Sequence, residues 1–176
     1  MPVIVISGQP GAGSTTIGTM LAKKLKISFF SPGNYFKSHS SAGNETDKML
    51  DFWSTEEGKS EQLHRKLDDM QRFLAEKGNI VIVGKLSIHM IKKADLKVWL
   101  KAPLDLRARR TAKRDSMSME ETKRKMKNRE QEERKRWKEI YGFDYFQQEK
   151  KADLVIDVSK KTPEQIVNKI IHAGKF

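Results

Sequence analysis

The chain has 176 residues and a mass of 20.3 kDa, enough for one full hydrophobic core and too few for two ordinary domains. Cysteine is absent, which excludes disulfides and thiolate metal sites. No apolar run approaches the roughly 20 residues of a membrane span, and the N-terminus lacks the basic region of a secretory signal. The sequence therefore predicts a single soluble domain in the cytoplasm.

The formal net charge is +12, and the sequence pI is about 9.8. Such a charge favours anionic partners, which include nucleotides, nucleic acids and acidic surfaces. The positive charge is densest between Arg107 and Lys138, so an anion would be drawn mainly to that stretch. Charge alone does not choose among these partners.

The N-terminal segment follows the order strand, glycine loop, helix. Residues 2–7 form a β-branched run of the kind that a strand buried on both faces of a parallel sheet carries. Glycine and proline crowd residues 8–13, so a turn must follow. From Ser14 onward the apolar residues recur at helical spacing, which predicts an amphipathic helix.

Four more apolar runs predict strands at residues 27–30, 80–83, 96–100 and 154–158. Enough chain separates successive strands for crossover helices, so the sequence predicts a parallel, three-layer α/β sheet of five strands. A last helix is expected after Thr162, because Thr162 can cap it, Pro163 suits its first position and Gln165 completes a capping box.

Two polar insertions interrupt this alternation, at about residues 33–78 and 116–144. The core of the domain is then expected at about residues 1–32, 79–115 and 145–176. Both insertions have a mostly helical pattern, which makes them candidate lobes over the sheet edge. The second has only methionines as sizeable apolar side chains before Trp137, so we expect it to bury little of itself and to move.

Residues 8–16 have the spacing of a phosphate-binding loop. Glycines let successive backbone N–H groups turn inward around phosphate oxygens, and the following helix adds its dipole. The candidate phosphate ligands are Gly8, Gln9, Pro10, Gly11, Ala12, Gly13, Ser14, Thr15 and Thr16. Among them, Thr15 is placed to reach Mg²⁺ bound to a nucleotide. The alternative is a glycine-rich turn that binds no ligand.

Ser14 stands where such loops normally place a lysine that reaches the β- and γ-phosphates. A serine hydroxyl is short and neutral, so charge stabilisation during phosphoryl transfer must come from elsewhere or be weaker. Arginines of the basic stretch could close over the phosphates, because each offers forked donors. They are Arg107, Arg109, Arg110, Arg114, Arg129, Arg134 and Arg136. The alternative for each arginine is a solvated charged face paired with nearby glutamates.

Several segments share their pattern with one family of enzymes. They are residues 6–16, 31–37, 82–86, 98–110, 129–130, 136–144 and 153–157. Taken together they resemble the nucleoside monophosphate kinases, and most closely the archaeal-type cytidylate kinases. The resemblance runs over nearly the whole chain, and its specific parts are residues 99–110 and the Tyr141-Gly142 region, since a phosphate loop alone is shared by many unrelated proteins.

This resemblance implies a P-loop kinase fold, with a five-stranded parallel sheet, a helical lobe for the nucleoside monophosphate and a lid. The implied reaction transfers the γ-phosphoryl group of ATP, with Mg²⁺, to CMP, dCMP or UMP. The implied catalytic residues are Arg110, which would attend ATP, and Arg129 and Arg136, which would act from the lid. The acceptor nucleotide would be held by Ser31, Gly33, Phe36, Lys37 and Lys85.

Some positions depart from the family pattern. Lys37 and Lys85 stand where arginine is usual, which keeps the charge and loses the bidentate fork. Val83 replaces an acid that would help to organise Mg²⁺ and is interpreted as a buried strand residue, and Met70 replaces an arginine near the acceptor site. A metal-organising carboxylate could come from Asp47, Asp51, Asp68 or Asp69, for which surface helix positions are the favoured interpretation. No catalytic part is assigned to His39, His64, His89 or His172.

Two other functions stay open. A kinase-derived protein could have lost turnover and kept nucleotide affinity, or exchanged it for RNA, with Trp53, Trp137 and Tyr145 as stacking surfaces. An enzyme of the same class could instead use AMP or a shikimate-like alcohol as its acceptor. The leading hypothesis is a monomeric phosphotransferase similar to cytidylate kinase, whose activity the departures could lower.

Overall fold

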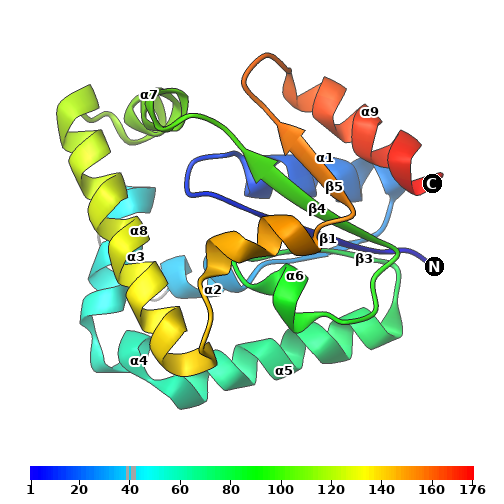
Figure 1. Cartoon of the computed structure of the whole chain (residues 1–176), viewed down its shortest axis with the longest axis horizontal. Coiled ribbons are helices and arrows are strands. Elements are labelled where there is room, and N and C mark those ends of the chain that lie inside the picture. The colour runs from blue at the N-terminus through cyan, green and yellow to red at the C-terminus, as the bar shows by residue number, and fades with distance from the viewer. Residues whose placement is uncertain (39, 41–42) are drawn as a thin grey trace.

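The computed structural model describes residues 1–38, 40 and 43–176, and at Trp53 it describes the backbone alone. Figure 1 shows a central sheet with helices on both faces and both chain termini at one end of the molecule. The five strands are all parallel and lie in the order β2-β3-β1-β4-β5. Their bounds are Val3–Gly8 (β1), Ser28–Phe30 (β2), Ile80–Val83 (β3), Leu96–Lys101 (β4) and Leu154–Asp157 (β5). The predicted strands and the three-layer α/β arrangement are therefore confirmed.

Helices connect the strands and cover both faces of the sheet. Their bounds are Ser14–Leu25 (α1), Pro32–Ser38 (α2), Glu45–Ser54 (α3), Glu56–Lys59 (α4), Glu61–Lys77 (α5), Ser87–Met90 (α6), Leu104–Asp115 (α7), Met119–Tyr141 (α8), Tyr145–Lys151 (the 3₁₀ helix η1) and Pro163–Gly174 (α9). Helix α9 begins with the predicted capping box, in which Thr162 and Gln165 bond reciprocally. No helix of the described residues is both long enough and apolar enough to cross a bilayer.

The central strand β1 is buried on both faces, which explains its unbroken β-branched run. Ile4 and Ile6 pack in a core cluster with residues of α1 and α9. Val3 and Val5, whose side chains alternate with these, belong to a second cluster that includes residues of α5, α6 and η1. The carboxyl ends of the strands point away from the chain termini, toward the end of the molecule along which α8 runs (Figure 1).

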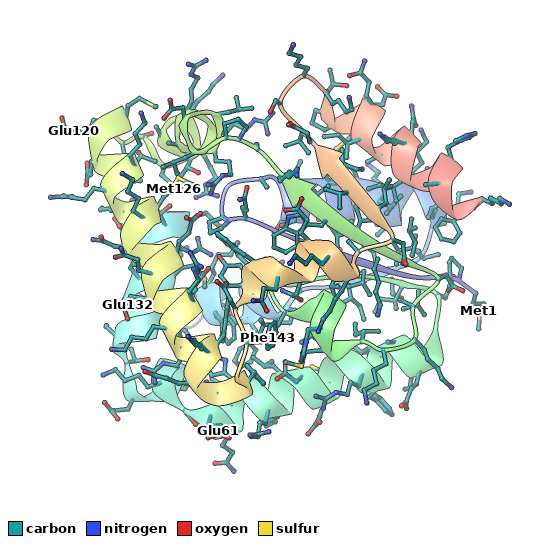
Figure 2. The ribbon with its side chains drawn as sticks, viewed as in Figure 1. Met1, Glu61, Glu120, Met126, Glu132 and Phe143 are labelled. Atoms are coloured by element: carbon teal, nitrogen blue, oxygen red, sulfur yellow. The ribbon has the colours of Figure 1, made fainter. Side chains whose placement is uncertain are left out.

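The second insertion folds as the long helix α8, which packs against α7 and η1. Most of α8 is not buried, as expected, but the helix does bury one stripe of side chains. These are Thr122, Met126, Glu133 and Trp137. The stripe follows helical spacing even though half of its members are polar, so a search for apolar residues alone misses it. In Figure 2, Met126 points from α8 toward the body of the protein, whereas Glu120 and Glu132 point away.

Met126 couples α8 to the phosphate loop and provides a test of this packing. Its side chain is 2% exposed, and its Cε lies 3.1 Å from the place where a Cβ on Gly11 would stand. We expect Met126→Ala to lower the free energy of unfolding by about 2 kcal/mol or more, because it leaves a cavity. Met119→Ala on the same helix is the matched control, since Met119 is 37% exposed. Equal effects of the two changes on chemical denaturation would contradict a packed α8.

Candidate active site

The phosphate loop joins β1 to α1, and its shape depends on three glycines. A Cβ on Gly8 would lie 2.6 Å from the backbone oxygen of Leu100, on the neighbouring strand. Gly11 and Gly13 have φ angles of +78° and +93°, which residues with a Cβ rarely adopt. The loop therefore has the local geometry that its glycine spacing predicts, and it leads directly into the first turn of α1 at Ser14.

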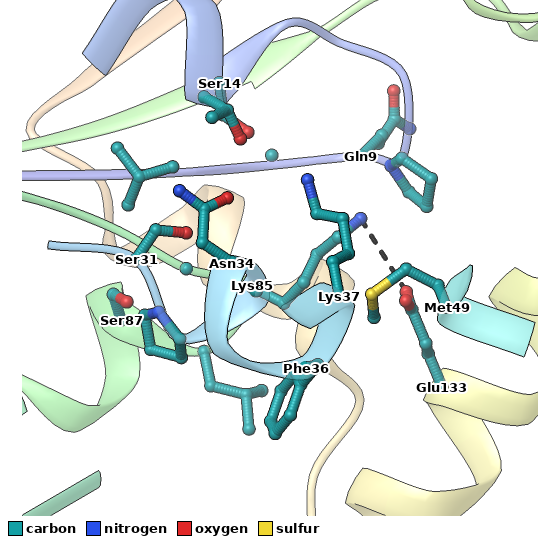
Figure 3. A pocket seen from close by; sticks show the side chains of 18 of the residues that line it. Gln9, Ser14, Ser31, Asn34, Phe36, Lys37, Met49, Lys85, Ser87 and Glu133 are labelled. Atoms are coloured by element: carbon teal, nitrogen blue, oxygen red, sulfur yellow. Dashed lines mark ion pairs between the residues drawn. The ribbon is translucent and has the colours of Figure 1, made fainter. Parts of the chain in front are cut away.

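A cavity of about 410 Å³ opens beside this loop. It is lined by the loop, by α2, α3, α5 and α8, and by the segment that follows β3. Every predicted loop residue except Ala12 lines it, and so do Ser31, Gly33, Phe36, Lys37, Lys85 and Arg129. Figure 3 shows Lys37 and Lys85 extending toward the loop that carries Ser14, whereas Phe36 points away from it. The cavity thus places two cations close to the position where the loop lacks its usual lysine.

Lys85 is held beside a buried carboxylate. Its Nζ atom is buried and lies 3.7 Å from the Oε2 atom of Glu133, although the side chain as a whole is 20% exposed. Within the described part of the chain, this Nζ atom has no hydrogen-bond partner. Glu133, on α8, also accepts a 2.8 Å hydrogen bond from Arg129 Nε and a 3.3 Å bond from the Tyr145 hydroxyl. The four residues join the end of β3, α8 and η1 into one charged cluster.

The electrostatics of this cluster follow from burial. Burial lowers the pKa of Lys85 to about 7, and the neighbouring charge of Glu133 only partly offsets it. Burial opposes the ionisation of Glu133 as well, but the positive charges of Lys85 and Arg129 hold its pKa below the ordinary value. Burial also raises the pKa of Tyr145 well above the ordinary value, so its hydroxyl stays neutral. Lys85 is therefore a cation whose charge an incoming anion can stabilise.

Other cations at the cavity are also held by carboxylates of the protein. Lys37 forms an ion pair with Glu45, which lines the same cavity. Arg114 lines it too and donates to both carboxylate oxygens of Asp115, each at 2.7 Å. Burial opposes the charge on Asp115, but hydrogen bonds from Arg114 and Thr46 hold the pKa of Asp115 below the ordinary value. An entering phosphate would thus meet a preformed set of cations and would exchange with Glu45 or Glu133.

Two of the three arginines implied as catalytic, Arg110 and Arg136, lie outside the cavity lining. The Arg110 guanidinium donates a 3.0 Å hydrogen bond to the carbonyl of Val158. Arg136 pairs with Glu139, on the same helix, at 3.7 Å. The roles assigned to these two side chains by resemblance stay predictions, whereas Arg129 lies in the cavity wall.

Arg107 has a different position from that of a mobile lid arginine. It is buried, and its guanidinium donates to the carbonyls of Ala102 and Pro10, each at 2.9 Å. The same group forms an ion pair of 2.5 Å with Glu130 of α8. Arg107 therefore connects the phosphate loop to both α7 and α8, and its hydrogen bond to the Pro10 carbonyl holds the backbone of the loop.

Helix α5 supplies residues that the sequence interpretation missed. Its buried positions are His64, Leu67, Asp68, Gln71 and Ala75, and the first four line the cavity. Their spacing of three and four residues is the signal that could have found them. Asp68 is only 5% exposed, so its interpretation as a surface residue is wrong. Met70 is 43% exposed and is not among the residues that line the cavity, so its side chain does not reach the acceptor region in this structure.

Two of the three aromatic residues proposed as stacking surfaces for RNA are not exposed on the surface. Trp137 and Tyr145 are both buried and pack edge to face, with ring centroids 4.8 Å apart. Neither ring is therefore exposed on the surface as a platform for the successive bases of an RNA strand. The side chain of Trp53 and the whole of His39 lie outside the described residues.

Val83, which replaces the acid of the family pattern, packs in the core. Val83 is buried at the end of β3, and its Cγ2 lies 2.3 Å from where a Cβ on Gly18 would stand. The interpretation of Val83 as a buried strand residue is confirmed. Gly18 gives the space for this contact, so that α1 packs closely against β3.

Comparisons with known proteins show the family of this chain. The sequence model of the cytidylate kinase-like family matches residues 3–160. The chain belongs to the cytidylate kinase-like family. The cytidylate kinase of Pyrococcus abyssi is 37% identical over 164 residues, covering 93% of this chain and 88% of that enzyme. The cytidylate kinase of Methanocaldococcus jannaschii is 35% identical over 170 residues, covering 94% and 93%.

Solved structures share the fold of this family member at low identity. An uncharacterized protein from Eubacterium ventriosum has a TM-score of 0.71 at 14% identity, with 99% of each chain covered. Shikimate kinase from Bacteroides thetaiotaomicron has a TM-score of 0.62 at 18% identity, also with 99% of each chain covered. These likenesses establish the P-loop kinase fold and, at such identities, carry no information about the acceptor.

The position of Lys85 predicts a pH dependence of anion binding. A bound phosphate raises the pKa of Lys85 from its value of about 7, so the contribution of Lys85 to binding is complete below that pH and is lost as the pH rises through the bound-state pKa. We expect the dissociation constant of CMP, chosen because the relatives are cytidylate kinases, to increase up to about tenfold per pH unit above neutrality. Isothermal titration calorimetry from about pH 6.5 to pH 9 measures this, a range above the second phosphate ionisation.

Lys85→Arg is the control for this prediction, because an arginine keeps its charge throughout that range. The charged groups around Lys85 are Glu133, Arg129, Glu130 and Arg107, and all of them stay in the variant. The Lys85→Arg profile should therefore be flatter than that of the unchanged protein. Identical slopes would show that Lys85 does not contribute its charge to phosphate binding.

Proposed function

We propose that this protein is an ATP-dependent phosphotransferase that moves the γ-phosphoryl group of ATP to CMP or a near relative such as dCMP or UMP. The observation that carries this proposal is that one cavity is lined both by the phosphate loop and by the acceptor-side residues Ser31, Phe36 and Lys37. Membership of the cytidylate kinase-like family and the names of the relatives support CMP as the acceptor. One chain supplies all of these residues.

The geometry suits a direct, in-line transfer, which depends on positioning and electrostatic stabilisation and needs no covalent intermediate. Loop N–H groups and the N-terminus of α1 would hold the ATP phosphates. Lys85 and Arg129 would face the transferred group and supply the charge that Ser14 lacks. Glu133 holds both cations in place before the substrates enter and competes with phosphate for them.

Mg²⁺ fits this site as a companion of the nucleotide. The described residues contain no group of three or more side chains of histidine, cysteine, aspartate or glutamate that could hold a metal ion. Thr15, in the first turn of α1, lines the cavity and would give one hydroxyl ligand. The phosphates and water would provide the rest, as is usual for Mg²⁺ in kinases. The ion would neutralise charge on the transferred phosphoryl group.

Turnover tests the proposal directly. Purified protein, ATP and Mg²⁺ are combined with CMP, dCMP, UMP, AMP or GMP, and ADP release is measured. We expect turnover with CMP and its near relatives, because the cavity places cations between the loop and an enclosed acceptor region. A folded protein that releases no ADP with any acceptor would contradict the proposed function.

Two lysine variants show whether the activity arises in this cavity. Lys37→Met should raise the KM for CMP at least about tenfold, because it removes a cation from the acceptor side and leaves Glu45 without its partner. Lys169→Met is the matched control, since Lys169 is exposed on α9. An activity unaffected by Lys37→Met would belong to a contaminating kinase or to another site.

A further inference from the structure

A continuous chain of hydrogen bonds forms one wall of the cavity beside α5. The Ser87 hydroxyl donates to Gln71 Oε1 at 2.5 Å, and Gln71 Nε2 donates to Asp68 Oδ1 at 3.1 Å. The Tyr141 hydroxyl donates to Asp68 Oδ2 from the last turn of α8. All four residues line the cavity. Gly84 makes room for this arrangement, because a Cβ there would lie 2.4 Å from Ser87 Oγ.

Each hydrogen bond in this chain points toward Asp68, which leaves the carboxylate as an acceptor with capacity to spare. An ionised carboxylate has about four lone-pair sites and no donor. Gln71 and Tyr141 use one site on each oxygen. Burial raises the pKa of Asp68 to about 6, so the group is mainly ionised at neutral pH. A ligand group that meets Asp68 must therefore be a hydrogen-bond donor.

The surroundings of Asp68 suit a flat ring. The same cavity is lined by Phe36, Met49, Leu67 and Trp137, whose side chains are apolar and buried. Phe36 packs on the rings of Phe52 and His64 and points away from the phosphate loop (Figure 3). Apolar side chains with a carboxylate acceptor beside them form an arrangement that can orient a small aromatic ligand. The phosphate end and this end of the cavity therefore differ in chemistry.

We propose that Asp68 determines the base specificity of this protein by accepting a hydrogen bond from the exocyclic amino group of cytosine. Cytosine presents an N4 amino donor, whereas uracil presents the O4 acceptor at the same position. An ionised Asp68 attracts the first and repels the second, so a pyrimidine with an amino group is favoured. Gln71 and Tyr141 position the carboxylate, and Ser87 fixes the orientation of the Gln71 amide. This inference rests on the proposed function, whose acceptor it narrows from pyrimidine nucleotides to those of cytosine.

Asp68→Asn tests the inference, because an amide has almost the same shape and can still accept from Tyr141 while it presents donors to the ligand. The measured quantity is the ratio of kcat/KM for CMP to kcat/KM for UMP. We expect the substitution to lower this ratio at least about tenfold, mainly by a loss on CMP. A purely structural role of Asp68, as a tether for α8, would reduce both values equally and leave the ratio unchanged. That result would overturn the inference.

Two further variants separate recognition from support. Asp69→Asn is the matched control, because Asp69 is the neighbouring carboxylate, is exposed and pairs with Arg72. Its ratio should equal that of the unchanged protein. Tyr141→Phe removes the hydrogen bond to Asp68 and keeps the acceptor, so most of the preference for CMP should survive. A loss of preference in Tyr141→Phe as large as that in Asp68→Asn would contradict a direct contact of Asp68 with the base.

Binding measurements keep this inference distinct from the proposed function. If no acceptor is phosphorylated, the proposed function fails, but calorimetry with CMP and UMP still tests Asp68. Tighter binding of CMP than of UMP by the unchanged protein, with the difference lost in Asp68→Asn, would support base recognition without turnover. Equal binding of the two nucleotides by the unchanged protein would overturn the inference. Thermal melting of each variant confirms that it is folded.

Discussion

The burial of Glu133 between two cations connects the parts of this molecule that must act together. Glu133 and Arg129 belong to α8, Lys85 follows β3, and Tyr145 begins η1, so one carboxylate joins α8 to the sheet and to η1. A buried ion cluster is a poor source of net stability, because desolvation of the charges offsets most of their attraction. Its effect is positional. It holds Lys85 and Arg129 in the cavity wall in the absence of substrate, and it makes the placement of α8 part of the active site.

Lys85 provides a positive charge in the cavity even though the phosphate loop lacks its usual lysine. A lysine at position 14 would be carried by the first turn of α1, whereas Lys85 enters from the end of the neighbouring strand β3. Figure 3 shows that its ammonium group nevertheless reaches the same cavity. Strands β1 and β3 are parallel neighbours, so residues that follow their carboxyl ends meet at one edge of the sheet. A positive charge carried by a different element, that of Lys85, therefore lies in the cavity that the phosphate loop also lines.

The sequence predicted the strands, the phosphate loop and the capped last helix because each has a local cause. Alternation, glycine spacing and the Thr162 capping box act within a few residues. The cavity wall was harder to predict, because its residues come together only through packing. From the sequence, Asp68 is interpreted as a surface acid on a polar helix. In the structure it is buried, and Tyr141, which is far along the chain, donates a hydrogen bond to it. Arg107 is one of several arginines in the basic stretch, and only the fold shows that it donates a hydrogen bond to the Pro10 carbonyl. In both cases the local pattern identified the helix correctly and left open which of its faces was buried.

The polar composition of α8 also hid its buried residues from sequence analysis. A helix with so many lysines, arginines and glutamates was expected to be loosely attached, yet its buried stripe includes Glu133 as well as Met126 and Trp137. Burial of a charge is tolerable only where partners compensate it, and the partners of Glu133 are the same cations that a phosphate would engage. A phosphate that binds Lys85 and Arg129 therefore weakens their hold on Glu133, which is part of what keeps α8 in place. The same carboxylate thus contributes both to the packing of α8 and to the set of charges that line the cavity.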